Sequence, residues 1–433
     1  ENEIVVGGLV QFGRDRLQQA EYDSVRITGR LNYLDVGRWI ETIDGLGDLT
    51  KVSLNEEIAT SLHSARLQID KLFVYEFELL NTYARLLRSD EAWFATLENA
   101  MLKGDVTVAD SYDRPIKIRL DRLNLETSGE AENSLDDINL SEVPAINFST
   151  DLLKINGENY GSWGFDFRME DEVAIFEELE ASVAGLRILP SSILEWKVSD
   201  ALDLSRIAAD IEIDDLAVTM SEFGLASSIE GRDFKISTDV SWLGSPAEID
   251  FERLTGQVDI REGKGRFVQA ETGGALKLLG IFDFASIARR LRLDFSDVLD
   301  KGFEFSEITG VTALNDGQIG MIEPIVIQGS TGKFTLGGEI DLITEELDNE
   351  MIVTLPVTKT LPWIAAYSAI AAGPLSGVGV MLAKVPSLEK KIEQYSSAKY
   401  RISGTIDEPE IEFVSFFDDK VAKASNEKSE KQR

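Results

Sequence analysis

Residues 234–242, FKISTDVSW, place Phe234, Ile236, Thr238, Val240 and Trp242 at alternate positions with polar side chains between them. A period of two is the pattern of a β-strand with one dry face and one wet face. The same pattern recurs in residues 254–260, 334–342, 351–357 and 400–406. The sequence therefore predicts a mainly β fold.

Glycine-containing turn signals separate these expected strands. Asn315-Asp316-Gly317 and Arg261-Glu262-Gly263 are typical of turns, and Gly263 with Gly265 predicts a hairpin turn. Residues 71–89 are ambiguous, with a strand pattern first and a helical one later.

Helices are predicted at few places. Asp35 is placed to cap a helix in which Val36, Trp39, Ile40 and Ile43 follow helical spacing, ending near Gly45. An amphipathic helix with a basic face is predicted over about 281–293. We expect the end of the chain, residues 416–433, to be a disordered tail.

Residues 360–383 carry no charged side chain and are long enough to span a bilayer. Gly373-Pro374 interrupts the segment, which favours short helices over a straight span. We expect a helical insert over about 361–396, which either plugs the end of the sheet or contacts a membrane. The candidate membrane contacts are the large apolar residues of this insert and two arginines of the basic helix: Trp363, Ile364, Ile370, Leu375, Val378, Met381, Leu382, Arg289 and Arg290.

Composition excludes several function classes. A net charge of −34 repels phosphate backbones, so we expect no nucleic-acid partner. The chain has no cysteine and a single histidine, His63, which leaves no thiol nucleophile and no histidine pair for a metal. We expect no catalytic residue, no metal site and no cofactor, and thus no enzyme. The absence of cysteine also favours an envelope protein over a cytosolic one.

The apolar stripes of the expected strands need a partner layer, and helices to cover them are scarce. The layer is either a second sheet or a ligand held against a curved, open sheet, and periodicity leaves both possible. If it is a ligand, the candidate groove residues are Phe234, Ile236, Val240, Trp242, Val258, Ile260, Phe334, Leu336, Ile340, Val353, Leu355 and Ile402.

An ordered series of short phrases between residues 254 and 413 resembles the C-terminal region of the AsmA-like family, and within it the YhdP-type proteins. The phrases include GRF at 265–267, TGGALKLLGIF at 272–282, LRLDFSD at 291–297, LNDG at 314–317, YRISG at 400–404 and PEIE at 409–412. A looser likeness extends over most of residues 90–415.

The resemblance implies an elongated, twisted antiparallel β-groove with a few short helices near its C-terminal end. Residues 1–415 would then be one continuous groove segment of a larger chain. The chain starts at Glu1 without a methionine, and we expect a piece whose N-terminal inner-membrane anchor is missing.

The resemblance also implies function. Such a groove would bridge the periplasm of a Gram-negative envelope and carry the acyl chains of phospholipids towards the outer membrane, supporting its barrier. The expected partners are phospholipids, the outer membrane at the C-terminal end and the inner membrane through the anchor. The alternative is a structural or assembly factor of the envelope, either a β-solenoid scaffold or an outer-membrane protein assembly factor of the TamB type.

Overall fold

The computed structural model describes residues 8–13, 24–38, 62–74, 77–89, 91–111, 113–126, 143–198, 202–222, 229–267, 304–330, 332–356, 395–406, 408–416 and 420–421. Within these ranges the fold is mainly β, as predicted. The chain divides into two compact units. Unit 1 comprises Glu1–Val183 and Ile193–Ser199, and unit 2 comprises Ala184–Ser192 and Asp200–Arg433.

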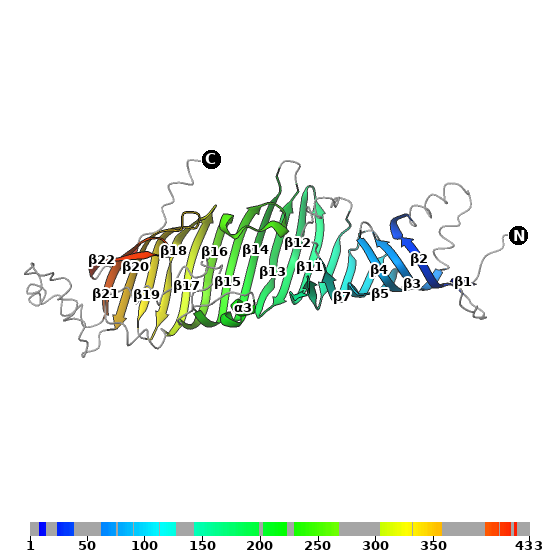
Figure 1. Ribbon diagram of the computed structural model, residues 1–433, viewed down its shortest axis with the longest axis horizontal. Helices are drawn as coiled ribbons and strands as arrows, with labels where there is room; N and C mark the ends of the chain where they lie inside the picture. Colours follow the sequence, from blue (N-terminus) through cyan, green and yellow to red (C-terminus); the bar gives the residue numbers. More distant parts are fainter. Residues whose placement is uncertain are drawn as a thin grey trace, which may run out of the picture. The chain divides into compact units, whose positions relative to one another are not determined.

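Unit 1 contains β1 to β12 (Figure 1). The strands are β1 (Gly8–Phe12), β2 (Val25–Asp35), β3 (Leu62–Val74), β4 (Phe77–Arg88), β5 (Ala92–Glu98), β6 (Leu102–Ala109), β7 (Ile116–Leu125), β8 (Ile146–Thr150), β9 (Leu153–Ile155), β10 (Glu158–Asn159), β11 (Ser162–Glu170) and β12 (Val173–Val183). β13 (Leu186–Lys197) contributes residues to both units.

Pairing in unit 1 is mixed. β3 to β7 pair antiparallel in chain order, and so do β8 with β11 and β11 with β12. In contrast, β1 with β2, β2 with β3, and β7 with β8 and β9 are parallel. A parallel pair needs a long connection between its strands, and alternation along one strand carries no information about such a partner.

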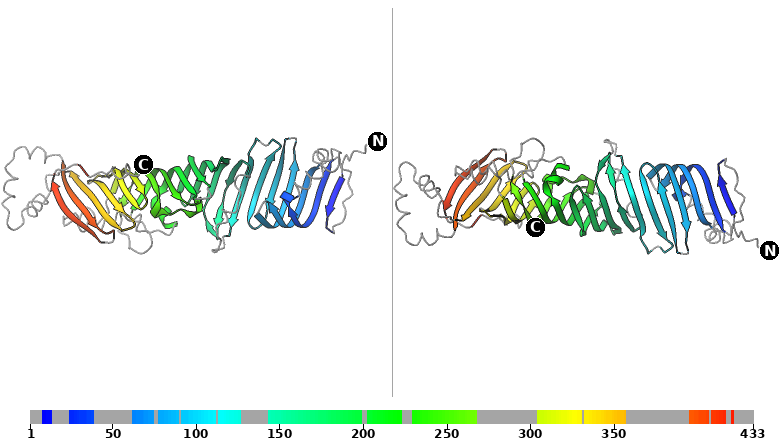
Figure 2. Two further views of the ribbon diagram at one scale, coloured as in Figure 1. Left: turned by 90° about the horizontal axis from the view of Figure 1, so that it is seen from above. Right: turned by 90° about the horizontal axis from the view of Figure 1, so that it is seen from below.

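Unit 2 is a run of strands joined antiparallel in chain order, from β14 to β22 (Figure 1). The elements are β14 (Leu204–Asp215), α3 (Leu216–Glu222), β15 (Ile229–Leu243), the 3₁₀-helices η2 (Pro246–Glu248) and η3 (Phe251–Arg253), β16 (Thr255–Phe267), β17 (Glu304–Asn315), β18 (Gln318–Gly329), β19 (Lys333–Asp341), β20 (Glu346–Pro356), β21 (Tyr395–Gly404) and β22 (Pro409–Phe416). Figure 2 shows that these strands turn relative to one another, the twist expected of a sheet of L-residues.

Each unit has apolar clusters on the dry faces of its strands. The unit 2 core is formed mainly by β17 to β21, with Met351, Leu336 and Ile340 among its most buried side chains. In unit 1, one cluster centres on Leu67 and Ile69 of β3, and a second centres on Phe167 and Trp196. The predicted alternation therefore corresponds to real burial.

The predicted turn at Arg261-Glu262-Gly263 is wrong, because these residues and Gly265 lie inside β16. A Cβ on Gly263 would lie 2.7 Å from ring carbons of Phe234, so this glycine makes room for an aromatic ring. The chain reverses between β15 and β16 through η2 and η3 instead, where Trp242 Nε1 donates to the Ser245 carbonyl oxygen over 3.0 Å.

The turn at Asn315-Asp316-Gly317 is confirmed. Asp316 and Gly317 both have positive φ, 45° and 87°, as a two-residue hairpin turn between right-twisted strands requires. The cap at Asp35 is confirmed as far as the structure describes it, since Arg38 N donates to Asp35 Oδ1 over 3.0 Å. The rest of that expected helix lies outside the described residues.

The ambiguous stretch 71–89 forms strands, the end of β3 and all of β4. Its helix-like pattern has a local cause. Asn81 has a φ of 50°, and the buried positions near it step by three, from Leu79 to Thr82 on β4 and from Ile69 to Leu72 on β3. A step of three imitates the spacing of one helix face.

The expected helix at 281–293 lies outside the described residues, as does the insert at 361–396 up to residue 394. β21 begins at Tyr395, and β22 reaches Phe416.

Candidate functional site

An apolar row crosses three neighbouring strands on the dry face of unit 2. Cross-strand register places Ile211, Ile236 and Ile260 side by side on β14, β15 and β16. Paired residues of neighbouring strands share a face, and all three side chains are half-buried and pack against the unit 2 core. This row is apolar surface that the described side chains cover only in part.

The groove candidates named from sequence divide into two groups. Most are buried by other side chains of unit 2, with exposed fractions between 2% and 5%: Phe234, Val240, Trp242, Phe334, Leu336, Ile340, Val353 and Ile402. Only Ile236, Val258 and Ile260 are half-buried. Leu355 lies in β20, but its side chain is outside the described part of the structure. Alternation identified the face of each residue but not its degree of burial.

The candidate membrane contacts all fall outside the described residues. This holds for Trp363, Ile364, Ile370, Leu375, Val378, Met381 and Leu382 of the expected insert and for Arg289 and Arg290 of the expected basic helix. Their role stays a prediction from sequence.

Unit 1 contains a second and longer apolar row that sequence reasoning missed. Register aligns five residues on β5, β6, β7, β8 and β11: Ala95, Val106, Ile118, Phe148 and Phe165. Each of them is half-buried. The signal was present in the sequence, because residues 92–98, 102–109 and 116–120 alternate like those of unit 2.

Aromatic rings extend this row. Phe148 and Phe165 stack with ring centroids 4.9 Å apart, and Phe176 lies 5.2 Å from both Phe165 and Phe167. A parallel row next to it contains Trp93 and Val108, which pair across β5 and β6; Val108 is 40% exposed. The dry face of unit 1 therefore offers apolar and aromatic surface that is accessible from outside.

The opposite face of the unit 2 strands is mainly polar and tied by cross-strand ion pairs. On unit 2, Arg206 Nη2 lies 2.8 Å from Asp239 Oδ2, and Lys235 Nζ lies 2.6 Å from Glu262 Oε2. The hydrogen bond from Arg206 lowers the pKa of Asp239, which stays ionised at neutral pH. This face suits water.

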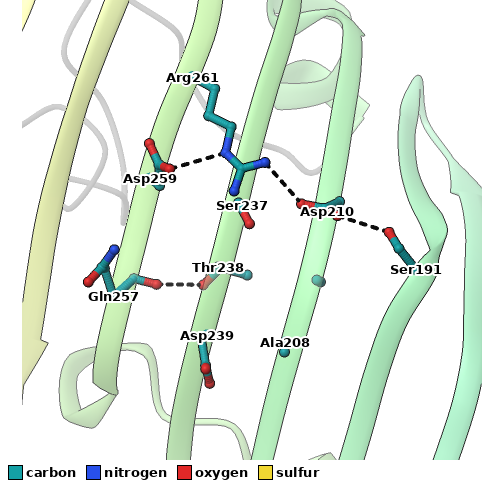
Figure 3. Close-up of a pocket in the computed structure, with 10 residues that line it drawn as sticks. Ser191, Ala208, Asp210, Ser237, Thr238, Asp239, Gln257, Asp259 and Arg261 are labelled. Atoms are coloured by element: carbon teal, nitrogen blue, oxygen red, sulfur yellow. Dashed lines mark hydrogen bonds and ion pairs between the residues drawn. The ribbon is translucent and has the colours of Figure 1, made fainter.

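A cavity of about 390 Å³ lies on unit 2, lined mainly by polar side chains (Figure 3). Arg261 stands between Asp259, at 3.1 Å, and Asp210, at 3.7 Å. A hydrogen bond from Ser191 is the largest cause of the lowered pKa of Asp210. Because these groups already satisfy one another and lie on the wet side, the cavity offers neither an apolar site nor an unpaired nucleophile and base.

Two further features concern only the residues that the structure describes. No group of three His, Cys, Asp or Glu side chains among them could hold a metal ion. None of the helices within the described ranges is long and apolar enough to cross a membrane. The single histidine, His63, is exposed on β3.

Comparison with known proteins agrees with the family resemblance seen in the sequence. A family model described as YhdP protein matches residues 5–411. The intermembrane phospholipid transporter YhdP of Escherichia coli (strain K12) is 25% identical over 257 residues, which cover 58% of this chain. The alignment spans 20% of that relative, so the aligned part of the chain corresponds to about a fifth of the relative's length. No solved structure matches the chain.

Proposed function

This chain belongs to the YhdP protein family, and from that premise we propose that it is a segment of an intermembrane phospholipid transport bridge. The observation that carries the proposal is the row Ala95–Val106–Ile118–Phe148–Phe165, half-buried apolar surface that continues without a polar break across five strands. The relative's printed function names the same class of cargo.

Acyl chains would lie on the dry faces while headgroups stay in water. Each buried methylene contributes about 0.8 kcal/mol, so two long chains are sheltered without any specific polar contact. A strip that repeats from strand to strand provides many positions of similar energy. A lipid can then move along the strip by small steps, whereas one closed pocket would hold it.

The two units would serve differently. In unit 1 and at Ile211, Ile236 and Ile260 of unit 2, apolar side chains are only half covered, and lipid is expected there first. Around Leu336 and Met351, the side chains of unit 2 cover one another. Lipid passing that region has to separate packed side chains or travel along their margin.

The placement of the protein in the envelope is part of the proposal. The full-length protein would be anchored in the inner membrane, cross the periplasm and reach the outer membrane with its C-terminal end, where it supports the barrier. The uncharged segment 360–383 supports a membrane contact at that end.

We also propose that the chain has no catalytic activity. The relative is named as a transporter, and the charged groups of the described cavity are engaged with one another. A transporter of this kind needs only an apolar surface along which lipid can move. The energy for transport and its direction must come from outside this chain.

Native mass spectrometry of the purified chain, combined with site-specific photo-crosslinking, tests the proposal. Phospholipid should co-purify, and a crosslinking amino acid at Ile118 or Ile236 should capture it. The matched controls are the neighbouring wet-face positions Arg119 and Lys235, where capture should be several-fold lower. A lipid-free mass with equal labelling of both faces would favour the alternative, a scaffold or an assembly factor of the envelope.

A further inference from the structure

The dry face of unit 1 has a charged group at its rim. Arg88 is the last residue of β4 and pairs across the sheet with Trp93 of β5, so its side chain belongs to the same face as the apolar rows. The arginine side chain is 19% exposed, which is low for a cation.

Arg88 reaches over β5 to a carboxylate on the next strand but one. Its Nη1 and Nη2 donate to Asp110 Oδ1 and Oδ2, both over 2.6 Å, and Asp110 directly follows β6. On the way, the guanidinium carbon lies 5.3 Å from the centroid of the Trp93 ring. One cation, one anion and one indole thus meet where the apolar strip ends.

The charge state of this group is fixed at neutral pH. The hydrogen bond from Arg88 lowers the pKa of Asp110, so the carboxylate stays ionised beside the guanidinium. Asp110 is also held through its backbone, because its N–H donates to the Glu91 carbonyl oxygen over 3.0 Å. The carboxylate side chain is 45% exposed and can meet a ligand from solvent.

We propose that Arg88, Asp110 and Trp93 form a headgroup site for a zwitterionic phospholipid, with the phosphate on Arg88 and the ammonium on Asp110. This inference rests on the proposed function and adds a preference among headgroups. The acyl chains of the same lipid would lie on Val108, Val106 and Ala95, which follow directly on the dry face.

The chemistry of the group matches that ligand better than an anionic lipid. Guanidinium is complementary to phosphate oxygens, and here the phosphate would share the guanidinium with Asp110, which already accepts from Nη1 and Nη2. A carboxylate also accepts hydrogen bonds from a primary ammonium. A lipid that carries only the phosphate charge would meet Asp110 as a repulsive neighbour, which is a means of discrimination. Indole rings favour the boundary between apolar chains and water.

The test uses the full chain with a photo-crosslinking amino acid at Val108, which is 40% exposed beside the site. The protein is incubated with vesicles of equal parts phosphatidylethanolamine and phosphatidylglycerol, and mass spectrometry identifies the headgroup of the captured lipid. We expect phosphatidylethanolamine to be enriched in the wild type. Asp110→Asn should reduce that enrichment about threefold, the scale of a partly exposed charge contact.

Two arginine variants and one control separate recognition from structure. Arg88→Gln should lower capture of both lipids, and Arg88→Lys should keep capture but lose part of the preference. Asp70→Asn removes the partner of Arg30 in another exposed ion pair of unit 1, at 2.8 Å, and should leave the ratio unchanged. Melting temperatures identify any variant that is merely unfolded. If Arg88→Gln or Asp110→Asn fails to fold, the headgroup ratio captured by the conservative variant Arg88→Lys tests the site.

An unchanged headgroup ratio in folded Asp110→Asn and Arg88→Lys, with lipid still captured, would overturn the headgroup site and leave the transport proposal intact. Absence of captured lipid from the wild type would overturn both. Titration with O-phosphoethanolamine addresses a soluble ligand: binding that depends on Asp110, combined with no lipid preference, would reassign the site to a free phosphate ester.

Discussion

The ring of Phe234 on β15 lies against Gly263 on β16, close enough that a Cβ on the glycine would sit 2.7 Å from two ring carbons. Phe234 is 5% exposed and belongs to the unit 2 core. The missing side chain is therefore a packing requirement in the middle of a strand.

We predict that Gly263→Ala destabilises the protein by about 1–3 kcal/mol, the usual cost of overfilling a packed core. The reason is the clash with the Phe234 ring, which cannot turn away without disturbing its neighbours. Urea unfolding measures the change. Gly8→Ala is the matched control, because a Cβ there has no atom within 4 Å. Equal midpoints for the two variants would contradict this account.

A buried polar pair supports the dry face of unit 1. Asn99 Nδ2 donates to Thr82 Oγ1 over 3.0 Å, and Asn99 Oδ1 accepts from Leu102 N over 2.7 Å. Asn99→Ala should cost about 1–3 kcal/mol, because Thr82 is 0% exposed and is left without its donor.

The pairing of these two residues is tested by a double-mutant cycle with Thr82→Val. The second substitution should cost less in the Asn99→Ala background than in the wild type, since the hydroxyl has already lost its partner. Strict additivity of the two free-energy changes would show that the hydrogen bond contributes nothing.

Acid should weaken unit 2 through its outer-face carboxylates. Hydrogen bonds from Arg206 and from Ser191 lower the pKa values of Asp239 and Asp210, respectively, in the folded chain. A carboxyl group whose folded pKa is depressed adds stability above its unfolded pKa, which is near the usual aspartate value of 3.8, and loses that stability as pH falls through the folded pKa.

Stability should therefore hold from neutral pH down to about pH 4 and decline below it. The part due to Asp239 should be small, because both partners of its ion pair are about half exposed. Arg206→Gln should flatten the decline below pH 4 in urea unfolding. An unchanged acid limb in that variant would assign the loss to other carboxylates.

The segment 361–383 is predicted from sequence to be the membrane-contacting end. Replacing Ile370 and Met381 together with Asp should preserve the melting temperature but abolish binding to liposomes, because a charged side chain is costly in an apolar phase. If the variant unfolds instead, the segment packs against the protein, and the membrane assignment is wrong.

Alternation was sufficient to predict most strands of unit 2. FKISTDVSW and the similar stretches each alternate between apolar and polar residues, which distinguishes the two faces of one strand. It was not sufficient for burial. Leu336 and Ile236 occupy equivalent places in similar patterns, yet Leu336 is 3% exposed and Ile236 is half-buried. The burial of a side chain depends on how many side chains of neighbouring strands pack over it. This in turn depends on the curvature of the whole sheet.

Two other features escaped prediction for local reasons. Gly263 was predicted to lie in a turn because glycine is typical of turns. In the structure this position lacks a side chain because the ring of Phe234 occupies the space. The row through Ile118 and Phe148 joins parallel strands β7 and β8, and such a partner cannot be read from the period of either strand. The membrane-contact candidates lie outside the described residues and stay predictions.

The chain-order antiparallel pairing of β14 to β22 has a consequence for how such a protein can change in length. Neighbouring strands lie about 4.8 Å apart, so duplication or loss of one hairpin alters the path across the sheet by roughly 10 Å. Away from the junction, every remaining strand keeps its neighbours in register, and the dry face stays continuous. Genes encoding sheets of this kind can therefore change the length of the sheet by gaining or losing hairpins, and new strand contacts are required only at the junction.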